Sequence, residues 1–267
     1  MMFIGIIPAR YASTRFPGKP LVDLCGKPMI QRVYEQASQV LDVVIVATDD
    51  QQIFQCVESF GGRVIMTSPD HQCGTDRVYE AYTIYRAENK LELPDSDVVV
   101  VNIQGDEPFI QPQQVQSLMD CFPTEIATLV HPFTKHDTWE DLQNPNYVKV
   151  AIARQDNPLS PNVIGRAMYF SRSVIPYMRG IESTQWLQEG SYFRHIGMYA
   201  YRADVLQIIT QLPQSPLERT ESLEQLRWLE NGLTIQVAMT EHASIGIDTP
   251  ADLENAIRFL ERQESNK

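Results

Sequence analysis

The chain has 267 residues, a formal net charge of −12 and 43% hydrophobic residues. This composition is typical of a soluble globular protein with enough core for one large α/β domain or two modest ones, and it argues against disorder. The excess of acidic residues disfavours nucleic acid and anionic membrane surfaces as partners. A small anion that is bound together with a metal ion remains compatible with it.

The first residues carry no basic segment ahead of an apolar one, and no run approaches the ~20 apolar residues that a membrane span needs. We therefore expect a cytoplasmic protein with no membrane partner. The four cysteines form no C-x-x-C pair, which argues against a structural zinc site and against a disulfide framework.

In the first half of the chain, apolar β-rich runs alternate with helical patterns, which predicts right-handed βαβ units and a largely parallel sheet. The run at residues 98–103 is the most continuous β-branched run in the sequence and is expected to be buried on both faces. The predicted strands cover residues 3–7, 43–47, 64–66 and 98–103. The predicted helices cover residues 29–41, about 53–60, 76–86 and 112–121.

The alternation loosens after a short strand at 127–130, and residues 131–194 are predicted to form a smaller antiparallel extension that makes a dimer contact. The predicted elements there are strands at 148–153 and 168–170, joined by polar connections at 154–166 and 178–191. Trp186 and Tyr192 are expected at the surface. A strand at 195–201 and helices at 203–212 and 221–230 follow. We expect one α/β domain over residues 1–267, with helices flanking a mostly parallel sheet.

A basic loop follows the first strand. Arg10, Arg15 and Lys19 lie within ten residues, and Gly18 allows the backbone to come close to a ligand. Arginine binds phosphate oxygens in bidentate fashion and lysine acts as a mobile point charge. The loop is therefore either a phosphate-binding site or an ordinary solvated loop.

A second polar loop, residues 67–77, leads into a helix. The Gly74-Thr75 pair lies where a helix N-terminus would offer free N–H groups to an anion. An ordinary N-cap explains Thr75 equally well. Cys73 is interpreted as a small packing residue.

Two aspartates follow apolar strands. Asp106 comes directly after the strand at 98–103, and in open parallel sheets ligands bind beyond the carboxyl ends of the strands. A carboxylate facing a phosphate-binding loop is repulsive unless a divalent cation lies between them, which makes Asp106 a candidate Mg²⁺ ligand or else a turn residue. Thr249, Pro250 and Asp252 form the start of a closing helix, and this leaves Asp248 available to join Asp106 on the metal.

Other polar residues have two readings each. Glu224 and Gln225 either recognise sugar hydroxyls or are solvated, and the second is the commoner case for adjacent polar residues on a helix. His195 is either a ligand or a hydrogen-bonded core residue. A nicotinamide-dependent oxidoreductase is disfavoured because no G-x-G-x-x-G turn follows the first strand. A nucleotide-sensing module would need the basic loop but not two metal carboxylates.

The first strand and the basic loop read Ile-Pro-Ala-Arg-Tyr-Ala-Ser-Thr-Arg-Phe-Pro-Gly-Lys-Pro at 7–20. Further motifs lie at residues 71–77, 102–108, 169–172, 194–199, 223–227 and 246–250, so that the set spans nearly the whole chain. Together and in this order, these segments resemble the signatures of the 3-deoxy-manno-octulosonate cytidylyltransferases, also called CMP-Kdo synthetases. Two departures stand out, because Cys73 replaces a more usual serine and residues 178–191 match no motif.

The resemblance implies a Rossmann-like nucleotidyltransferase that joins CTP to the sugar acid Kdo, yielding CMP-Kdo and pyrophosphate for lipopolysaccharide synthesis. It implies Mg²⁺ as the metal and a homodimer as the assembly. By position, the triphosphate and cytidine would be held by Pro8, Ala9, Arg10, Arg15, Lys19, Gly74, Thr75, Arg77, Gln104 and Asp106. Mg²⁺ would be held by Asp106 and Asp248, and the sugar by Arg172, Arg179, His195, Glu224 and Gln225.

The expected reaction is in-line attack of the anomeric hydroxyl on the α-phosphorus, with Arg10, Lys19, Asp106 and Asp248 as its catalytic groups. No side chain stands out as a general base. The enzymatic alternative is the related CMP-sialic acid synthetase, which has a differently spelled first loop. A modified Kdo also remains open as the substrate, because discrimination between hydroxyls depends on the placement of side chains.

Overall fold

The computed structural model describes residues 1–12, 16–71, 73–155, 160–242, 246–247 and 249–265. The chain divides into two compact units, residues 1–115 with 244–267 and residues 116–243, and each is considered by itself. No helix among the described residues has both the length and the apolar character that a membrane crossing requires.

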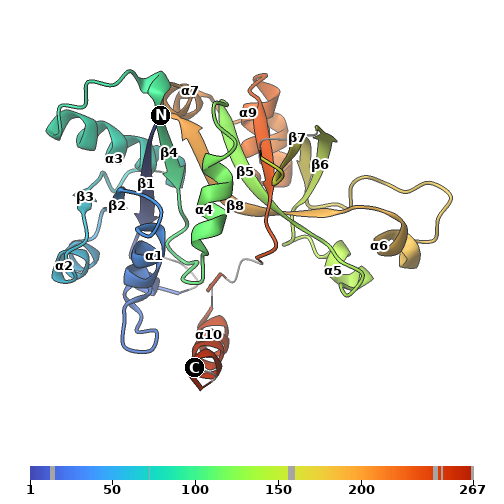
Figure 1. The fold of residues 1–267 in the computed structure, drawn as a ribbon, viewed down its shortest axis with the longest axis horizontal. Helices are drawn as coiled ribbons and strands as arrows, with labels where there is room; N and C mark the ends of the chain where they lie inside the picture. Colours follow the sequence, from blue (N-terminus) through green and yellow to red (C-terminus); the bar gives the residue numbers. More distant parts are fainter. Residues whose placement is uncertain (13–15, 72, 156–159, 243–245, 248, 266–267) are drawn as a thin grey trace. The chain divides into compact units, whose positions relative to one another are not determined.

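The first unit contains a parallel sheet of β-branched strands. The strands lie side by side in the order β3-β2-β1-β4, as Figure 1 shows. Every residue of β2 and β4 is buried, as expected for parallel strands covered on both faces. The strands are β1 (Met2–Ala9), β2 (Val43–Thr48), β3 (Val64–Met66) and β4 (Val98–Asn102). The four predicted strands of this sheet are confirmed.

The helices of this unit follow the predicted apolar stripes. On α1, Ile30, Val33 and Ala37 are buried, and the helix contacts β1 and β2. It ends four residues earlier than predicted. The α-helices are α1 (Met29–Ala37), α2 (Gln51–Ser59), α3 (Gly74–Glu88) and α10 (Pro250–Ser265), and the 3-10 helices are η1 (Lys19–Leu21) and η2 (Asp95–Asp97). The helix α4 (Pro112–Met119) spans the boundary between the two units in sequence.

The cap of α10 is the one that the sequence predicts. The Asp252 carboxylate accepts hydrogen bonds from the backbone N–H and the hydroxyl of Thr249, and the Thr249 hydroxyl accepts one from the Asp252 N–H. The helix packs on a buried cluster that includes Leu24, Met29 and Ile247. Residues from the loops after β1 and β4 pack on the same cluster, namely Phe16 and Phe109.

The second unit contains a mixed sheet with the strand order β8-β5-β9-β7-β6. The β5–β9 pair is parallel, and the β5–β8, β6–β7 and β7–β9 pairs are antiparallel. The strand β6 also pairs with β8 at Lys149 and Arg194. The strands are β5 (Ile126–Pro132), β6 (Lys149–Arg154), β7 (Val163–Ser171), β8 (Phe193–Arg202) and β9 (Ile235–Met239).

The predictions for this unit were partly wrong. The strand β7 begins within the predicted polar connection at 154–166. The helix predicted at 221–230 begins only at residue 225, because residues 216–221 form a separate short helix. Short helices also occupy segments for which none was predicted. The helices are α5 (Trp139–Gln143), η3 (Ser183–Gln185), α6 (Trp186–Glu189), α7 (Ala203–Gln211), α8 (Pro216–Glu221) and α9 (Gln225–Glu230).

The expected exposure of Trp186 and Tyr192 was wrong. Only 5% of Trp186 and 1% of Tyr192 are exposed, because the two residues form a small core with Leu142. The Trp186 indole donates to the carbonyl of Ile181 and stacks parallel to the Tyr192 ring. The extension therefore has an apolar cluster of its own, which a loose alternation pattern does not reveal.

Candidate active site

Three segments of the first unit meet at Pro8, near the carboxyl end of β1. A Cβ placed on Gly74 would lie 3.7 Å from the Pro8 Cγ, and one placed on Gly105 would lie 3.1 Å from the Pro8 carbonyl oxygen. The start of α3 and the loop after β4 therefore both approach β1 closely. Only glycine fits at position 105 without a local shift.

The basic loop after β1 closes on itself through Gly18. Gly18 is in the left-handed conformation, with φ of 69°, and its N–H donates to the carbonyl of Tyr11 over 3.0 Å. This conformation suits glycine, so Gly18 has a role in folding the loop, and its role in letting the backbone approach a ligand stays a prediction. Arg10 is exposed at the start of the loop. Arg15 lies outside the described residues.

Lys19 ends this loop beside Asp106. The Lys19 Nζ lies 2.6 Å from the Asp106 Oδ2, and 12% and 31% of the two side chains are exposed. The prediction that Asp106 faces the basic loop is therefore confirmed for Lys19. The carbonyl of Asp106 also accepts a hydrogen bond from the N–H of Ile247, over 2.9 Å. Asp248, the next residue in sequence, lies outside the described residues.

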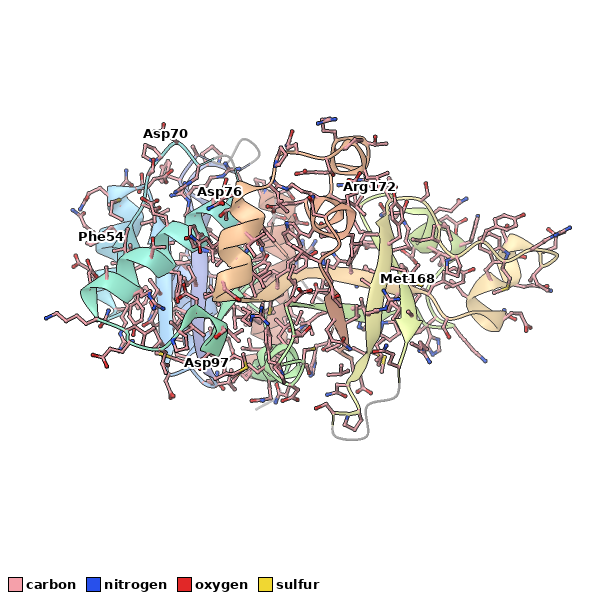
Figure 2. All side chains as sticks on the ribbon, turned by 90° about the horizontal axis from the view of Figure 1, so that it is seen from above. Phe54, Asp70, Asp76, Asp97, Met168 and Arg172 are labelled. Carbon is pink, nitrogen blue, oxygen red and sulfur yellow. The ribbon has the colours of Figure 1, made fainter. Side chains whose placement is uncertain are left out.

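The first turn of α3 is capped by Cys73. The Cys73 Sγ accepts a hydrogen bond from the N–H of Asp76, which Figure 2 labels, over 3.4 Å. Cys73 is therefore the N-cap, and the reading of Thr75 as the cap was wrong. Thr75 is buried in the first turn, and Gly74 is exposed. Gln104 is half-buried in the loop after β4.

The cap gives a direct prediction for stability. Because a serine hydroxyl accepts this hydrogen bond better than a thiol, Cys73→Ser should raise the free energy of unfolding by up to about 1 kcal/mol. Urea denaturation would measure the change. Cys25→Ser, at a position that caps no helix, is the matched control and should shift it little. A Cys73→Ser protein no more stable than this control would contradict the capping role.

Arg77 is committed to neighbouring side chains. Its guanidinium donates to the Thr67 hydroxyl over 2.6 Å and to the Asp49 carboxylate over 2.8 Å. The arginine is 4% exposed, so this charge is buried and needs such partners. Asp49 and Thr67 follow β2 and β3, and Arg77 therefore ties α3 to the ends of both strands.

The candidate sugar residues belong to the second unit. Arg172 follows β7, the strand on which Figure 2 labels Met168. Its guanidinium donates to the carbonyls of Pro145, Glu221 and Ser222. Arg179 is exposed in the connection between β7 and η3.

His195 is partly buried between aromatic rings. It lies against Phe170 and Tyr199, and its Nε2 is 3.1 Å from the Thr128 hydroxyl. Desolvation by burial lowers the pKa of His195 to about 3, so the imidazole is neutral at physiological pH. It can therefore take part in hydrogen bonds but cannot hold a carboxylate as a cation.

Glu224 and Gln225 lie at the start of α9. The Glu224 carboxylate accepts a hydrogen bond from Arg227 over 2.8 Å and is half-buried. Gln225 is only 5% exposed, so the reading of a solvated pair was wrong for it. Its buried Nε2 has no hydrogen-bond partner within the described ranges. A buried amide without a partner is costly, so this group points to a ligand or a water molecule.

A buried lysine, which the sequence analysis did not single out, donates hydrogen bonds to the backbone next to these candidate sugar residues. Lys149 on β6 is fully buried, and its Nζ donates to the carbonyls of Asn144, over 3.0 Å, and Arg172, over 2.5 Å. Desolvation lowers the pKa of Lys149 to about 8. Alternating residues at 148–153 predicted the strand, but they gave no sign that its lysine faces inward.

The lysine gives a prediction for pH dependence. From about pH 8 to the ordinary pKa of 10.5, the unfolded chain holds the proton more tightly than the folded one, so deprotonation adds stability as pH rises. The free energy of unfolding of the wild type minus that of Lys149→Met should therefore rise across this range, by up to about 1.4 kcal/mol per pH unit. Denaturant titrations at several pH values would test it. A constant difference would contradict a depressed pKa.

Asn102 and Asp49 were also missed. Asn102 ends β4 with a buried side-chain oxygen that has no partner in the described part of the chain. The Thr48-Asp49-Asp50 run is typical in sequence of a turn followed by a helix cap. Asp50 does cap α2, accepting from the N–H groups of Gln52 and Ile53. Nothing in that pattern distinguishes Asp49 as the partner of Arg77.

Comparison with known proteins shows the same family along both units. A family model described as cytidylyltransferase matches residues 4–235. Over 264 residues the chain is 58% identical to the 3-deoxy-manno-octulosonate cytidylyltransferase of Parabacteroides distasonis, covering 97% of this chain and 98% of that protein. The enzyme of the same name from Phocaeicola vulgatus is 56% identical over 267 residues, with 99% of both chains covered.

A solved structure agrees with these relatives. A CMP:2-keto-3-deoxy-manno-octonic acid synthetase complexed with CTP has a TM-score of 0.81 to this chain at 42% identity. The similarity covers 98% of this chain and 100% of that one. It therefore includes the parallel sheet of the first unit and the mixed sheet of the second.

Proposed function

Because this chain belongs to the cytidylyltransferase family and to its 3-deoxy-manno-octulosonate members, we propose that it joins CTP to Kdo, forming CMP-Kdo and pyrophosphate for lipopolysaccharide synthesis. The observation that carries the proposal is the Lys19–Asp106 pair. It places a cation suited to phosphate and a carboxylate suited to a metal at one point beyond the parallel strands.

The nucleotide would be bound by positively charged side chains and by backbone that approaches it closely. Arg10 and Lys19, with Arg15, would neutralise the triphosphate, and Pro8, Ala9, Gly74, Thr75 and Gln104 would line the cytidine. The approach of Gly74 and Gly105 to Pro8 supports this grouping. Arg77 would contribute indirectly, by holding the start of α3 in place, since its guanidinium donates to Thr67 and Asp49.

The residues present fit Mg²⁺. The ion commonly takes one or two carboxylates together with substrate phosphates, and Asp106 offers a partly exposed carboxylate. The hydrogen bond from Ile247 to the Asp106 carbonyl supports Asp248 as the second ligand. Because Mg²⁺ is usually held by only one or two protein carboxylates, substrate phosphates would complete its coordination. A bound Mg²⁺ would spread the charge of the triphosphate and lower the pKa of the sugar hydroxyl.

For the transfer itself, the chain mainly positions and neutralises. Lys19 would stabilise negative charge on the phosphates while the anomeric hydroxyl attacks the α-phosphorus in line with the departing pyrophosphate. His195 is a poor general base at neutral pH because its pKa is near 3. On the sugar side, Gln225 would donate its buried N–H to a hydroxyl, and Glu224 would accept from one. Arg179, which is exposed, would contact the carboxylate of Kdo, and Arg172, whose guanidinium nitrogens donate to backbone carbonyls, would favour it through its positive charge.

Pyrophosphate release tests the proposal. The purified protein would be given CTP and Mg²⁺ with Kdo, an amino-substituted Kdo or N-acetylneuraminic acid in parallel, and each of the other nucleoside triphosphates with Kdo. We expect release that depends on both CTP and Kdo. Preference for the nine-carbon acid would indicate a CMP-sialic acid synthetase, and release without any sugar acid would contradict transfer. We also expect a cytoplasmic homodimer with contacts in residues 131–194, which sedimentation and interface variants would test.

A further inference from the structure

The junction between α8 and α9 is held in an unfavourable backbone conformation. The helix α8 ends at Glu221, and Ser222 then has φ of 53° and ψ of 49°, in the left-handed region. A non-glycine residue pays a conformational penalty there, so its surroundings must hold it in place. Glu224 and Gln225 follow within three residues.

Glu221 is bonded to the end of β7 through both of its carboxylate oxygens. The Ser171 hydroxyl donates to the Oε1 over 2.6 Å, and the Arg172 N–H donates to the Oε2 over 2.9 Å. The Arg172 side chain returns the contact, because its Nε donates to the Glu221 carbonyl over 2.7 Å and its Nη2 to the Ser222 carbonyl over 3.3 Å. We call these four bonds the Glu221 clamp.

Two further hydrogen bonds of Arg172 hold the clamp in place. The Arg172 Nη1 donates to the carbonyl of Pro145 over 2.9 Å, and the Arg172 carbonyl accepts from the buried Lys149 ammonium over 2.5 Å. The negative charge of Glu221 favours the charged form of Lys149. Each of the three guanidinium nitrogens of Arg172 thus donates a hydrogen bond to a backbone carbonyl.

We infer that Glu221 is a positioning residue of the sugar-acid site, which acts through the clamp on Glu224 and Gln225. The inference rests on the proposed function, in which these two residues bind the sugar. Gln225 is nearly fully buried with an unpaired Nε2, so its amide is useful only if the backbone holds it in one place. The clamp fixes the start of α9, and a small displacement there misaligns both polar groups.

Steady-state kinetics with both substrates tests the inference. Glu221→Ala should raise the KM for Kdo by about 10- to 100-fold and leave the KM for CTP within about twofold. Glu221→Gln should recover most of the loss, because its amide can accept from the Arg172 N–H and donate to the Ser171 hydroxyl. Ser171→Ala, which removes one bond, should give a smaller rise and is the milder variant if Glu221→Ala does not fold.

Ser215→Ala is the matched control. It removes the N-cap of α8, where the Ser215 hydroxyl accepts from the Glu218 N–H, and does not touch the clamp. It should lower the melting temperature and leave the KM for Kdo unchanged. The inference would be overturned if Glu221→Ala raised the KM for CTP as much as the KM for Kdo. It would also be overturned if Gln225→Ala raised the KM for Kdo and Glu221→Ala did not. Either result would leave the proposed function standing. An unaltered protein without Kdo-dependent turnover would overturn the proposed function, and the inference with it.

Discussion

Asp106→Asn is expected to lower kcat by about 100- to 1,000-fold while leaving the KM for CTP unchanged or lower. The asparagine keeps the shape of the side chain but loses the charge that would bind Mg²⁺. It also removes a negative charge that repels the triphosphate and pairs with Lys19, so CTP binding is not weakened. Pyrophosphate release at saturating CTP and Kdo, together with Mn²⁺ binding followed by electron paramagnetic resonance, would measure both effects.

Asp97→Asn provides the control for this variant. Asp97 is an exposed carboxylate in η2 of the same unit and is labelled in Figure 2. Its loss should change neither turnover nor Mn²⁺ binding. If Asp106→Asn kept normal turnover at saturating Mg²⁺, Asp106 would not be a metal ligand. Asp248→Asn should lower kcat in the same way as Asp106→Asn. Normal turnover of this variant at saturating Mg²⁺ would show that Asp248 is not a metal ligand.

Lys19→Met should lower the affinity for CTP and raise the affinity for the metal ion. Loss of one charged contact to the triphosphate should weaken CTP binding and turnover by about 10- to 100-fold. Without the ammonium 2.6 Å from its Oδ2, however, Asp106 should bind Mn²⁺ more tightly in the absence of CTP. Isothermal titration calorimetry with CTP and with Mn²⁺, each alone, would separate the two effects.

Lys27→Met is the comparison for Lys19. Lys27 forms an exposed ion pair with Glu35 over 2.7 Å, and a surface pair of this kind contributes little. Neither CTP nor Mn²⁺ affinity should change. Weaker Mn²⁺ binding by Lys19→Met than by the wild type would show that the ion pair does not compete with the metal.

The first unit was predictable because local patterns decide its structure. The buried parallel strand β4 begins with four consecutive valines, and the apolar residues of α1 recur at regular helical spacing. The start of α10 has its capping residues at fixed spacing. The placement of Asp106 beside Lys19 followed from one rule, that loops at the carboxyl ends of parallel strands share an edge.

The second unit was harder because long-range contacts decide it. The break at Ser222 is stabilised by Ser171 and Arg172, about fifty residues away, so the local pattern at 221–230 resembles one helix. Trp186 is buried by Leu142 and Tyr192 in a cluster with no regular period. The buried state of Gln225 likewise depends on tertiary packing, which a pair of polar residues in sequence does not indicate.

The central claim is that the chain transfers a cytidylyl group from CTP to Kdo. ³¹P NMR of the protein with CTP, Kdo and Mg²⁺ follows every phosphorus atom and tests this most directly. We predict loss of the CTP signals with equal growth of pyrophosphate and of one phosphodiester signal, and no change when Kdo is left out. Appearance of CDP and inorganic phosphate, or of pyrophosphate and CMP without a phosphodiester, would contradict the transfer.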